Sequence, residues 1–218
     1  MPMQKLDILA FGAHPDDVEL GCAGTILAAV AEGKKVGIID LTKGELGTRG
    51  TTSIRLKEAQ LASQVLGVDV RDNLGMADGF FKNDQEHQFA IIECIRRFQP
   101  TIVLCNAPED RHPDHGRAAN LVADACFLAG LSKIQSTHNG LAQAAWRPAN
   151  VFHYIQSRNL TPSFVVDISA HMEKKMESIL AHASQFYDPT SKEPSTFISG
   201  NSFLEFVKGR AKELGQQI

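Results

Sequence analysis

Residues 8–20 read ILAFGAHPDDVEL: an apolar run that ends in glycine, then a polar loop, then the start of a helical pattern. Helical patterns and further short β-branched runs alternate along the rest of the chain. The expected strands are 8–12, 36–41, 101–105, 151–155 and 164–168, with a weaker one at 68–70. The expected helices are 18–32, 54–66, 86–98, 114–129, 170–186 and 201–214. This alternation predicts an α/β, Rossmann-like fold, with a mainly parallel sheet covered by helices on both faces.

Composition places the chain among ordinary globular proteins. Its 218 residues are 43% hydrophobic and 22% charged, and we expect residues 1–218 to form a single domain. The formal net charge is −3, and no run of Lys or Arg exceeds two residues. Nucleic acid and anionic membrane surfaces are therefore poor candidate partners.

Two further features bear on location. The N-terminus lacks a basic segment followed by an apolar one, so we expect no signal peptide and a cytoplasmic protein. Four cysteines are present without a C-x-x-C pair, which favours buried free thiols over disulfides or structural zinc.

The polar part of the opening stretch is the first candidate site. His14, Asp16, Asp17 and Glu19 lie within six positions, directly after the first strand. Ligands of parallel sheets bind beyond the carboxyl ends of the strands, which is where these residues fall. A nucleotide-binding Rossmann module is disfavoured, because no G-x-G-x-x-G is present and the acidic side chains would repel a phosphate. A histidine among carboxylates instead favours a divalent cation.

A second cluster, EDRHPDH at 109–115, follows the expected strand 101–105. Its His112 and His115 are three positions apart and can project to one side of a helix that begins near Pro113. Catalytic zinc needs three protein ligands and an open water position, and the two clusters supply more than that. A surplus carboxylate can take a proton from the water, and a surplus histidine can stabilise an oxyanion.

Simpler interpretations compete with a catalytic metal site. Asp16, Asp17 or Asp114 can serve as plain helix N-caps. A purely structural metal site is disfavoured, because structural zinc is usually enclosed by cysteines.

The two clusters carry a family resemblance. AHPDDVE at 13–19 and HPDH at 112–115 resemble the signature of the LmbE-like, or PIG-L, family of metal-dependent N-acetylglucosaminyl deacetylases. The similarity continues through LTKGELGTRGT at 41–51, LGMAD at 74–78 and HASQ at 182–185. It therefore spans most of the chain.

The resemblance implies a role for each matching residue. His14, Asp17 and His115 would bind the metal, Asp16 would be the general base, and His112 would be the cationic partner of the tetrahedral intermediate. Arg55 and Asp78 match family positions that contact substrate, with a surface charge and a turn residue as their alternatives. We expect Asp114 to accept a hydrogen bond from one of the histidines.

The segment GELGTRGT makes the bacillithiol-biosynthesis deacetylase the most similar branch of the family. This resemblance implies N-acetyl-α-glucosaminyl L-malate as the substrate, with chitobiose or an inositol conjugate as alternatives. It also implies a homo-oligomer, either a trimer or a hexamer. Zn²⁺ is the expected metal, with Fe²⁺ and Mn²⁺ as alternatives, since a ligand set of two histidines and an aspartate accepts all three.

Overall fold

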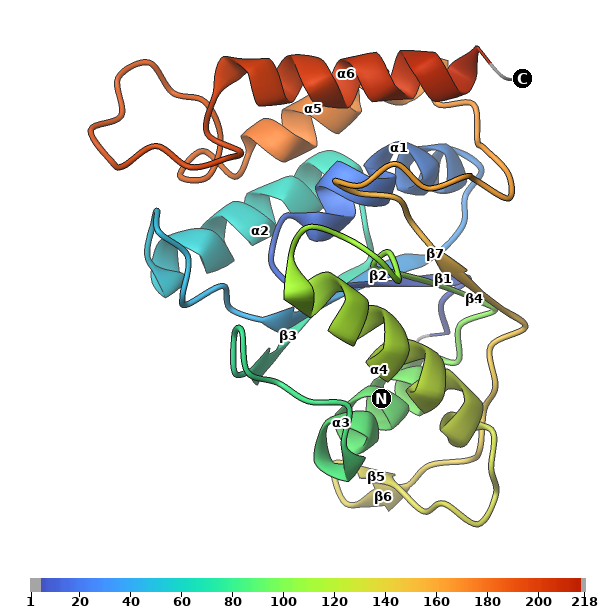
Figure 1. The fold of residues 1–218 in the computed structure, drawn as a ribbon. Coiled ribbons are helices and arrows are strands. Elements are labelled where there is room, and N and C mark those ends of the chain that lie inside the picture. The colour runs from blue at the N-terminus through green and yellow to red at the C-terminus, as the bar shows by residue number, and fades with distance from the viewer. Residues whose placement is uncertain (1–4, 217–218) are drawn as a thin grey trace.

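A five-stranded parallel sheet forms the centre of the computed structural model, which describes residues 5–216 (Figure 1). The strand order is β3-β2-β1-β4-β7, and every neighbouring pair is parallel. The strands are β1 (Ile8–Gly12), β2 (Val36–Thr42), β3 (Val70–Met76), β4 (Ile102–Cys105) and β7 (Asn150–His153). The expected α/β class is confirmed.

Helices cover both faces of this sheet (Figure 1). One face carries α1 (Asp17–Ala31) and α2 (Thr52–Leu66), with α5 (Met172–Leu180) packed on both and α6 (Asn201–Gly215) outermost. The other face carries α3 (Gln85–Phe98) and α4 (Pro113–Ala129), which pack against each other. A two-stranded hairpin of β5 (Thr137–His138) and β6 (Leu141–Ala142) lies beside α3.

Strand β1 shows why its sequence is an unbroken apolar run. Leu9 and Phe11 belong to the core on the α3–α4 side, whereas Ile8 and Ala10 belong to the core on the α1 side. Successive side chains of a strand point to opposite faces, so a strand covered on both sides needs apolar residues throughout.

The strand order has a switch point between β1 and β4. From β1 the chain passes through β2 to β3 on one side, and β4 and β7 then extend the sheet on the other side. Such a switch point leaves a crevice at the carboxyl ends of the two central strands. The residues after β1 and after β4 are the two histidine clusters, so the topology brings them to one place.

Two glycines of α1 allow the chain after β7 to lie against this helix. A Cβ at Gly21 would lie 2.2 Å from the Tyr154 ring, and a Cβ at Gly24 would lie 2.6 Å from Ile168. These glycines therefore serve close packing, in agreement with the missing dinucleotide fingerprint.

Three expectations for the secondary structure are wrong. Residues 164–168 are not a strand, because within the described chain their backbone joins no ladder; Phe164 instead contacts the Phe152 ring, with the ring centroids 5.0 Å apart. The weak strand at 68–70 is displaced to β3, Val70–Met76. The helix expected at 170–186 is divided into η1 (Ser169–His171) and α5, which ends at Leu180.

The cysteines agree with expectation, since all four are buried free thiols. Among the described residues, no helix is long and apolar enough to cross a membrane.

Candidate active site

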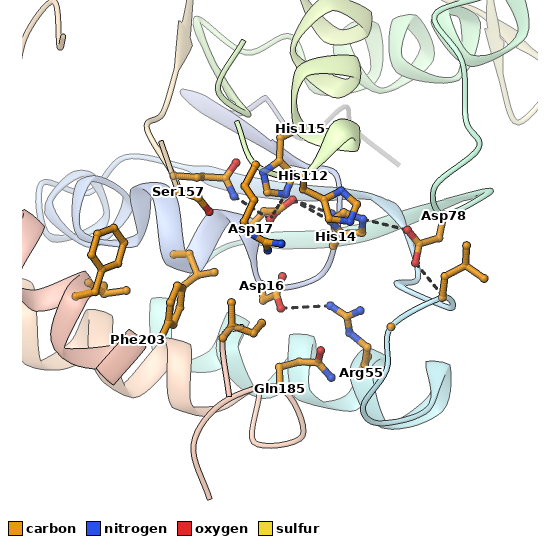
Figure 2. Close-up of a pocket in the computed structure, with 18 of the residues that line it drawn as sticks. His14, Asp16, Asp17, Arg55, Asp78, His112, His115, Ser157, Gln185 and Phe203 are labelled. Atoms are coloured by element: carbon orange, nitrogen blue, oxygen red, sulfur yellow. Dashed lines mark hydrogen bonds and ion pairs between the residues drawn. The ribbon is translucent and has the colours of Figure 1, made fainter. Parts of the chain in front are cut away.

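A pocket of about 230 Å³ lies at the switch point (Figure 2). The loop after β1 lines it with His14, Asp16 and Asp17, and the start of α4 lines it with His112 and His115. The two sequence clusters therefore share one cavity, as expected from their positions after neighbouring strands.

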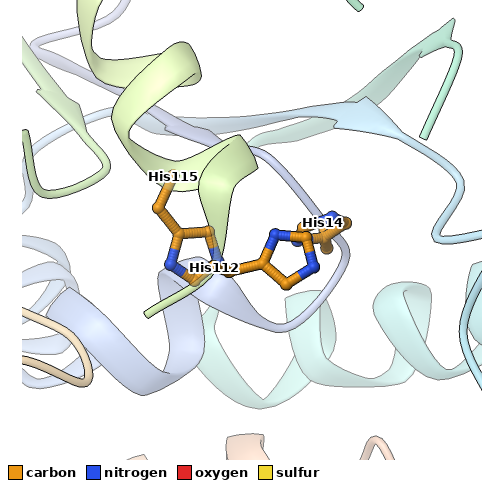
Figure 3. A group of neighbouring side chains, drawn as sticks. All are labelled: His14, His112 and His115. Carbon is orange, nitrogen blue, oxygen red and sulfur yellow. The ribbon is translucent and has the colours of Figure 1, made fainter. Parts of the chain in front are cut away.

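The three histidines converge at the floor of this pocket (Figure 3). The His14 ring centroid lies 4.6 Å from that of His112 and 5.7 Å from that of His115. One nitrogen from each of the three rings lies within 4.8 Å of the others. Asp17 lies beside two of them, with Oδ2 3.5 Å from His14 Nδ1 and Oδ1 3.1 Å from His115 Nε2.

Asp17 is held from several sides. Its Oδ2 accepts hydrogen bonds from the His14 amide at 2.9 Å and from Asn106 Nδ2 at 3.0 Å. Its Oδ1 accepts one from Gln156 Nε2 at 2.8 Å. Burial raises the pKa of Asp17, but the His115 charge and hydrogen bonds from both histidines outweigh burial and lower it well below its usual value. Asp17 is thus a fixed, charged carboxylate.

Asp16 adopts an unusual backbone conformation at the entrance to α1. Its φ is 141° and its ψ is −19°, a region that residues with a Cβ rarely occupy. Its side chain makes no capping hydrogen bond, so the N-cap interpretation does not describe Asp16. Burial and the neighbouring Asp17 raise the pKa of Asp16, with Arg55 acting against them, and the net shift is upward. A carboxylate with a raised pKa is suited to accept a proton.

Two of the three histidines, His14 and His115, also contact further carboxylates. His14 Nε2 lies 3.0 Å from Asp78 Oδ1 and 3.4 Å from Asp114 Oδ2. The expected contact between Asp114 and a histidine is therefore present. His115 Nδ1 is hydrogen-bonded to Asp110, whose other oxygen accepts from the amides of residues 157 and 158.

These carboxylates affect the histidine pKa values. Burial lowers the pKa of His14, but hydrogen bonds to Asp114, Asp17 and Asp78 raise it well above the ordinary value. Burial likewise opposes protonation of His115, yet Asp17 and Asp110 raise its pKa to about 9. Both imidazoles therefore compensate the negative charge around them.

His112 differs from the other two. It is the N-cap residue of α4, and its Nδ1 accepts a hydrogen bond from the Asp114 amide at 3.3 Å. Burial, followed by the charges of His14 and His115, lowers the pKa of His112, which favours its neutral form. Because Nδ1 is an acceptor, the proton of this neutral ring resides on Nε2, which makes Nε2 a donor.

The donor set fits a divalent metal ion. The group within metal-binding distance is His14, His112 and His115. The set that the family resemblance implies, His14, Asp17 and His115, gives two imidazoles and one carboxylate, which is a common ligand set of catalytic zinc. Carboxylates that contact ligand histidines orient such rings. Among the described residues, one ligand atom each from His14, Asp78 and Asp114 also lie within 4.8 Å of one another, and this second group shares His14 with the three histidines.

Arg55 and Asp78 border the same pocket. Arg55 is buried, which rules out the surface-charge alternative; its guanidinium donates to Gly44 O, to Pro15 O and to Asp16 Oδ2. Asp78 accepts a hydrogen bond from the Leu46 amide at 2.9 Å besides its contact with His14. Both side chains thus support His14 and Asp16 directly.

Asp110, Asn106 and Gln156 are site residues that the sequence interpretation did not single out. A signal was available for Asp110, which lies inside the second cluster, and for Asn106, which immediately follows β4. Gln156 offered no signal, because it reaches Asp17 from a loop 139 positions away in sequence.

Comparison with known proteins gives concordant matches. The sequence model of the PIG-L family, described as GlcNAc-PI de-N-acetylase, matches residues 9–126. Diacetylchitobiose deacetylase of Thermococcus kodakarensis is 32% identical over 82% of this chain and 70% of that protein. A Bacillus anthracis protein with the name "Probable N-acetyl-alpha-D-glucosaminyl L-malate deacetylase 2" is 29% identical over 82% of this chain and 81% of its own.

A solved structure matches as well. A conserved protein of Thermus thermophilus has a TM-score of 0.80 and 38% identity, covering 94% of this chain and 84% of that one. The family match includes both histidine clusters, and the structural match includes the sheet and its helices.

Proposed function

The chain belongs to the PIG-L family of deacetylases, and on that premise we propose that it removes acetate from N-acetyl-α-glucosaminyl L-malate. Hydrolysis of the acetamide of an N-acetylglucosamine conjugate is the activity shared with its relatives. The malate aglycone is the finer proposal, supported by the Bacillus anthracis relative. Diacetylchitobiose and an inositol conjugate are the alternative substrates.

One observation carries this proposal: His14, Asp17 and His115 meet in a pocket that also contains Asp16 and His112. We propose that the first three would hold a divalent metal, Zn²⁺ with Fe²⁺ or Mn²⁺ as alternatives. When bound, such a metal lowers the pKa of a water molecule and polarises a carbonyl group. The carboxylates of residues 78, 110 and 114 keep the ligand histidines in place.

Asp16 is the proposed base. Its raised pKa lets the carboxylate take one proton from the water that attacks the acetamide carbon. The same proton then passes from Asp16 to the amine nitrogen as the C–N bond breaks, which leaves a free amine and acetic acid. The proton of the acid then passes to the amine, so the products are acetate and an ammonium group. Arg55 holds Asp16 Oδ2 at 3.3 Å and fixes its direction.

His112 is the proposed partner of the oxyanion. Its Nε2–H can donate a hydrogen bond to the oxygen that gains negative charge during the attack. We further propose that Arg55 and Asp78 contact the sugar, because both border the pocket next to His14 and Asp16.

We also propose that residues 1–218 act as a single deacetylase domain in a homo-oligomer, a trimer or a hexamer, without nucleic acid or membrane partners. Exposed apolar side chains beside α5, among them Phe164 and Leu180, support self-association. The four free cysteines favour the cytoplasm.

The test measures acetate release from N-acetylglucosaminyl malate, diacetylchitobiose and an N-acetylglucosaminyl inositol, with metal content determined on the same samples. We expect Asp16→Ala to retain metal and to lose turnover by about 10²- to 10⁴-fold, because it removes the proton acceptor. His14→Ala should lose the metal itself. The exposed Asp167 provides a matched control, since Asp167→Ala should behave as wild type.

Near-wild-type turnover of Asp16→Ala would show that another group is the base. A metal-loaded wild-type protein that releases acetate from none of the three substrates would refute the proposed function.

A further inference from the structure

Helix α6 forms a second wall of the pocket. Phe203, Val207 and Arg210 all line the cavity that contains His14 and Asp16. They are four and three positions apart, so they share one face of the helix. Figure 2 shows Phe203 on the side of the pocket away from Asp78. The α6 wall is therefore placed to contact the aglycone, the part of a substrate that extends beyond the histidines.

Arg210 is an unpaired cation in this wall. Its Nη1 is buried and has no hydrogen-bond partner among residues 5–216. Within the same described range, no carboxylate lies within 4 Å of its guanidinium. Burial lowers the pKa of Arg210 and the charge of Asp110 opposes this shift, but that carboxylate is already occupied by His115 and by the Ser157 and Arg158 amides. A buried donor of a charged group without a partner is unfavourable unless a ligand supplies the acceptor.

Arg111, an exposed residue, adds a second cation to the lining of the pocket. Its guanidinium stacks on the Phe197 ring at 4.5 Å, and the described residues provide no carboxylate partner for it. Arg55, the remaining arginine of the pocket, is instead committed to Asp16 and two carbonyl groups. Arg210 likewise lies over the Phe206 ring, at 5.3 Å. Arg111 and Arg210 are thus the guanidinium groups of the pocket that have no carboxylate partner among the described residues.

The charges of the lining are separated. Asp17 and Asp78 contact His14, and Asp16 pairs with Arg55, whereas the α6 wall contributes Arg210 and no carboxylate. An anionic group of a substrate is repelled by the carboxylates and attracted by the arginines, which fixes the orientation of an asymmetric ligand. The neutral acetamide then lies at the histidines.

We propose that Arg210, assisted by Arg111, binds an anionic group on the aglycone, so that the enzyme selects N-acetylglucosaminyl conjugates with a carboxylate or phosphate beyond the sugar. A guanidinium recognises both groups through paired, charge-assisted hydrogen bonds. This inference rests on the proposed deacetylase function and makes Arg210 a specificity-determining residue.

The test compares kcat/KM of the metal-loaded enzyme for three substrates: N-acetylglucosaminyl malate, N-acetylglucosaminyl glycerol phosphate and the neutral methyl N-acetylglucosaminide. We expect Arg210→Gln to lower the ratio of acidic to neutral kcat/KM by about tenfold to a hundredfold, mainly through KM. Arg210→Lys should recover part of the ratio. Lys212→Gln removes a cation from the same helix outside the pocket and should leave the ratio unchanged.

The two acidic substrates distinguish a carboxylate from a phosphate. The substrate whose kcat/KM falls more in Arg210→Gln carries the natural anionic group. Equal losses on acidic and neutral substrates, or no loss on either acidic substrate, would overturn the inference. The proposed function would survive those results, because it fails only if wild-type protein deacetylates none of its substrates.

A binding measurement supplies an independent readout. The reaction product glucosaminyl malate, titrated calorimetrically into each variant, should bind Arg210→Gln at least about tenfold more weakly than wild type or Lys212→Gln. Equal affinities in all three proteins would also overturn the inference. Unfolding midpoints of the variants, compared with wild type, verify that each one is folded.

Discussion

Two carboxylates of α1, Asp17 and Glu19, are only two residues apart and both are buried, yet their surroundings differ. Asp17 is compensated by His14 and His115 and faces the pocket. Glu19 is fully buried and pairs with Arg71, which also bonds both oxygens of Asp40 at 2.9 and 3.0 Å. Burial raises the pKa of Glu19, but Arg71 outweighs it and brings the pKa to about 2.

The difference lies in the kind of cation. A guanidinium stays protonated and compensates Glu19 permanently, so that cluster is closed. Imidazoles can release their protons and ligate a metal, so the compensation of Asp17 can be exchanged for a dication. Glu19 also lies 3.5 Å from His182 Nε2, but its strongest partner is the permanent cation Arg71. Of these two adjacent acidic clusters, the one neutralised by histidines alone is therefore the candidate for function, and the one neutralised mainly by arginine is structural.

The largest expected effect concerns the closed cluster. Arg71→Met leaves Glu19 and Asp40 buried without their cation, and should lower the free energy of unfolding by about 3–5 kcal/mol. Urea denaturation of the metal-free protein measures this loss. The exposed pair of Arg97 and Asp72 gives a control, since Arg97→Met should cost at most about 1 kcal/mol.

Asp17→Asn completes the contrast between the clusters. It should abolish metal binding while destabilising the metal-free protein less than Arg71→Met does, because its histidines can become neutral. If Arg71→Met were as stable as Arg97→Met, the structural role of the closed cluster would be disproved.

A smaller effect is expected from Asp110, the carboxylate that is hydrogen-bonded to the proposed ligand His115. Asp110→Asn weakens the support of His115 and should reduce Zn²⁺ affinity by about 10- to 100-fold, measured by competition with a chromophoric chelator. Asp72→Asn, remote from the pocket, should leave that affinity unchanged. An unaltered affinity of Asp110→Asn would mean that His115 needs no such support.

The smallest effect concerns Lys175, a buried cation of α5 that donates to Leu20 O. Burial lowers its pKa from 10.5 to about 8. Between these values the unfolded chain binds more protons than the folded one, so the destabilising contribution of Lys175 is full below about pH 8 and disappears as pH rises toward 10.5. Lys175→Met should therefore stabilise the protein by about 1–2 kcal/mol at pH 7, and this gain should vanish near pH 11.

Denaturant unfolding of wild type and Lys175→Met at several pH values checks the sign. A gain that grew with increasing pH would contradict a lowered pKa for Lys175. The variant also sharpens the comparison above, because Lys175 is a buried charge that has neither a carboxylate nor a metal to compensate it among the residues described.

The sequence indicated the sheet, most helices and the meeting of the two clusters, because these depend on local periodicity and on where strands end. It misplaced β3, whose Arg71 and Asp72 look like loop residues until the ion pair with Asp40 is known. It also took the β-branched residues near Val166 for a strand, although no neighbouring backbone pairs with them in the described chain.

Within the site, the motif residues, Asp78 and Asp114 could be foreseen, but the support from Gln156 and the contact between Asp78 and His14 could not. Gln156 reaches Asp17 and Asp78 reaches His14 across 139 and 64 positions of sequence. Arg210 was missed for the same reason, since only the folded chain places α6 against the pocket. Long-range contacts of this kind leave no local pattern.

The backbone of Asp16 has an evolutionary consequence. A φ of 141° suits glycine and costs a residue with a side chain about 1–3 kcal/mol. Selection for folding alone would therefore favour glycine at position 16, and a library screened only for thermal stability should enrich it. The strained aspartate at this position is what the proposed base requires, at a cost in stability.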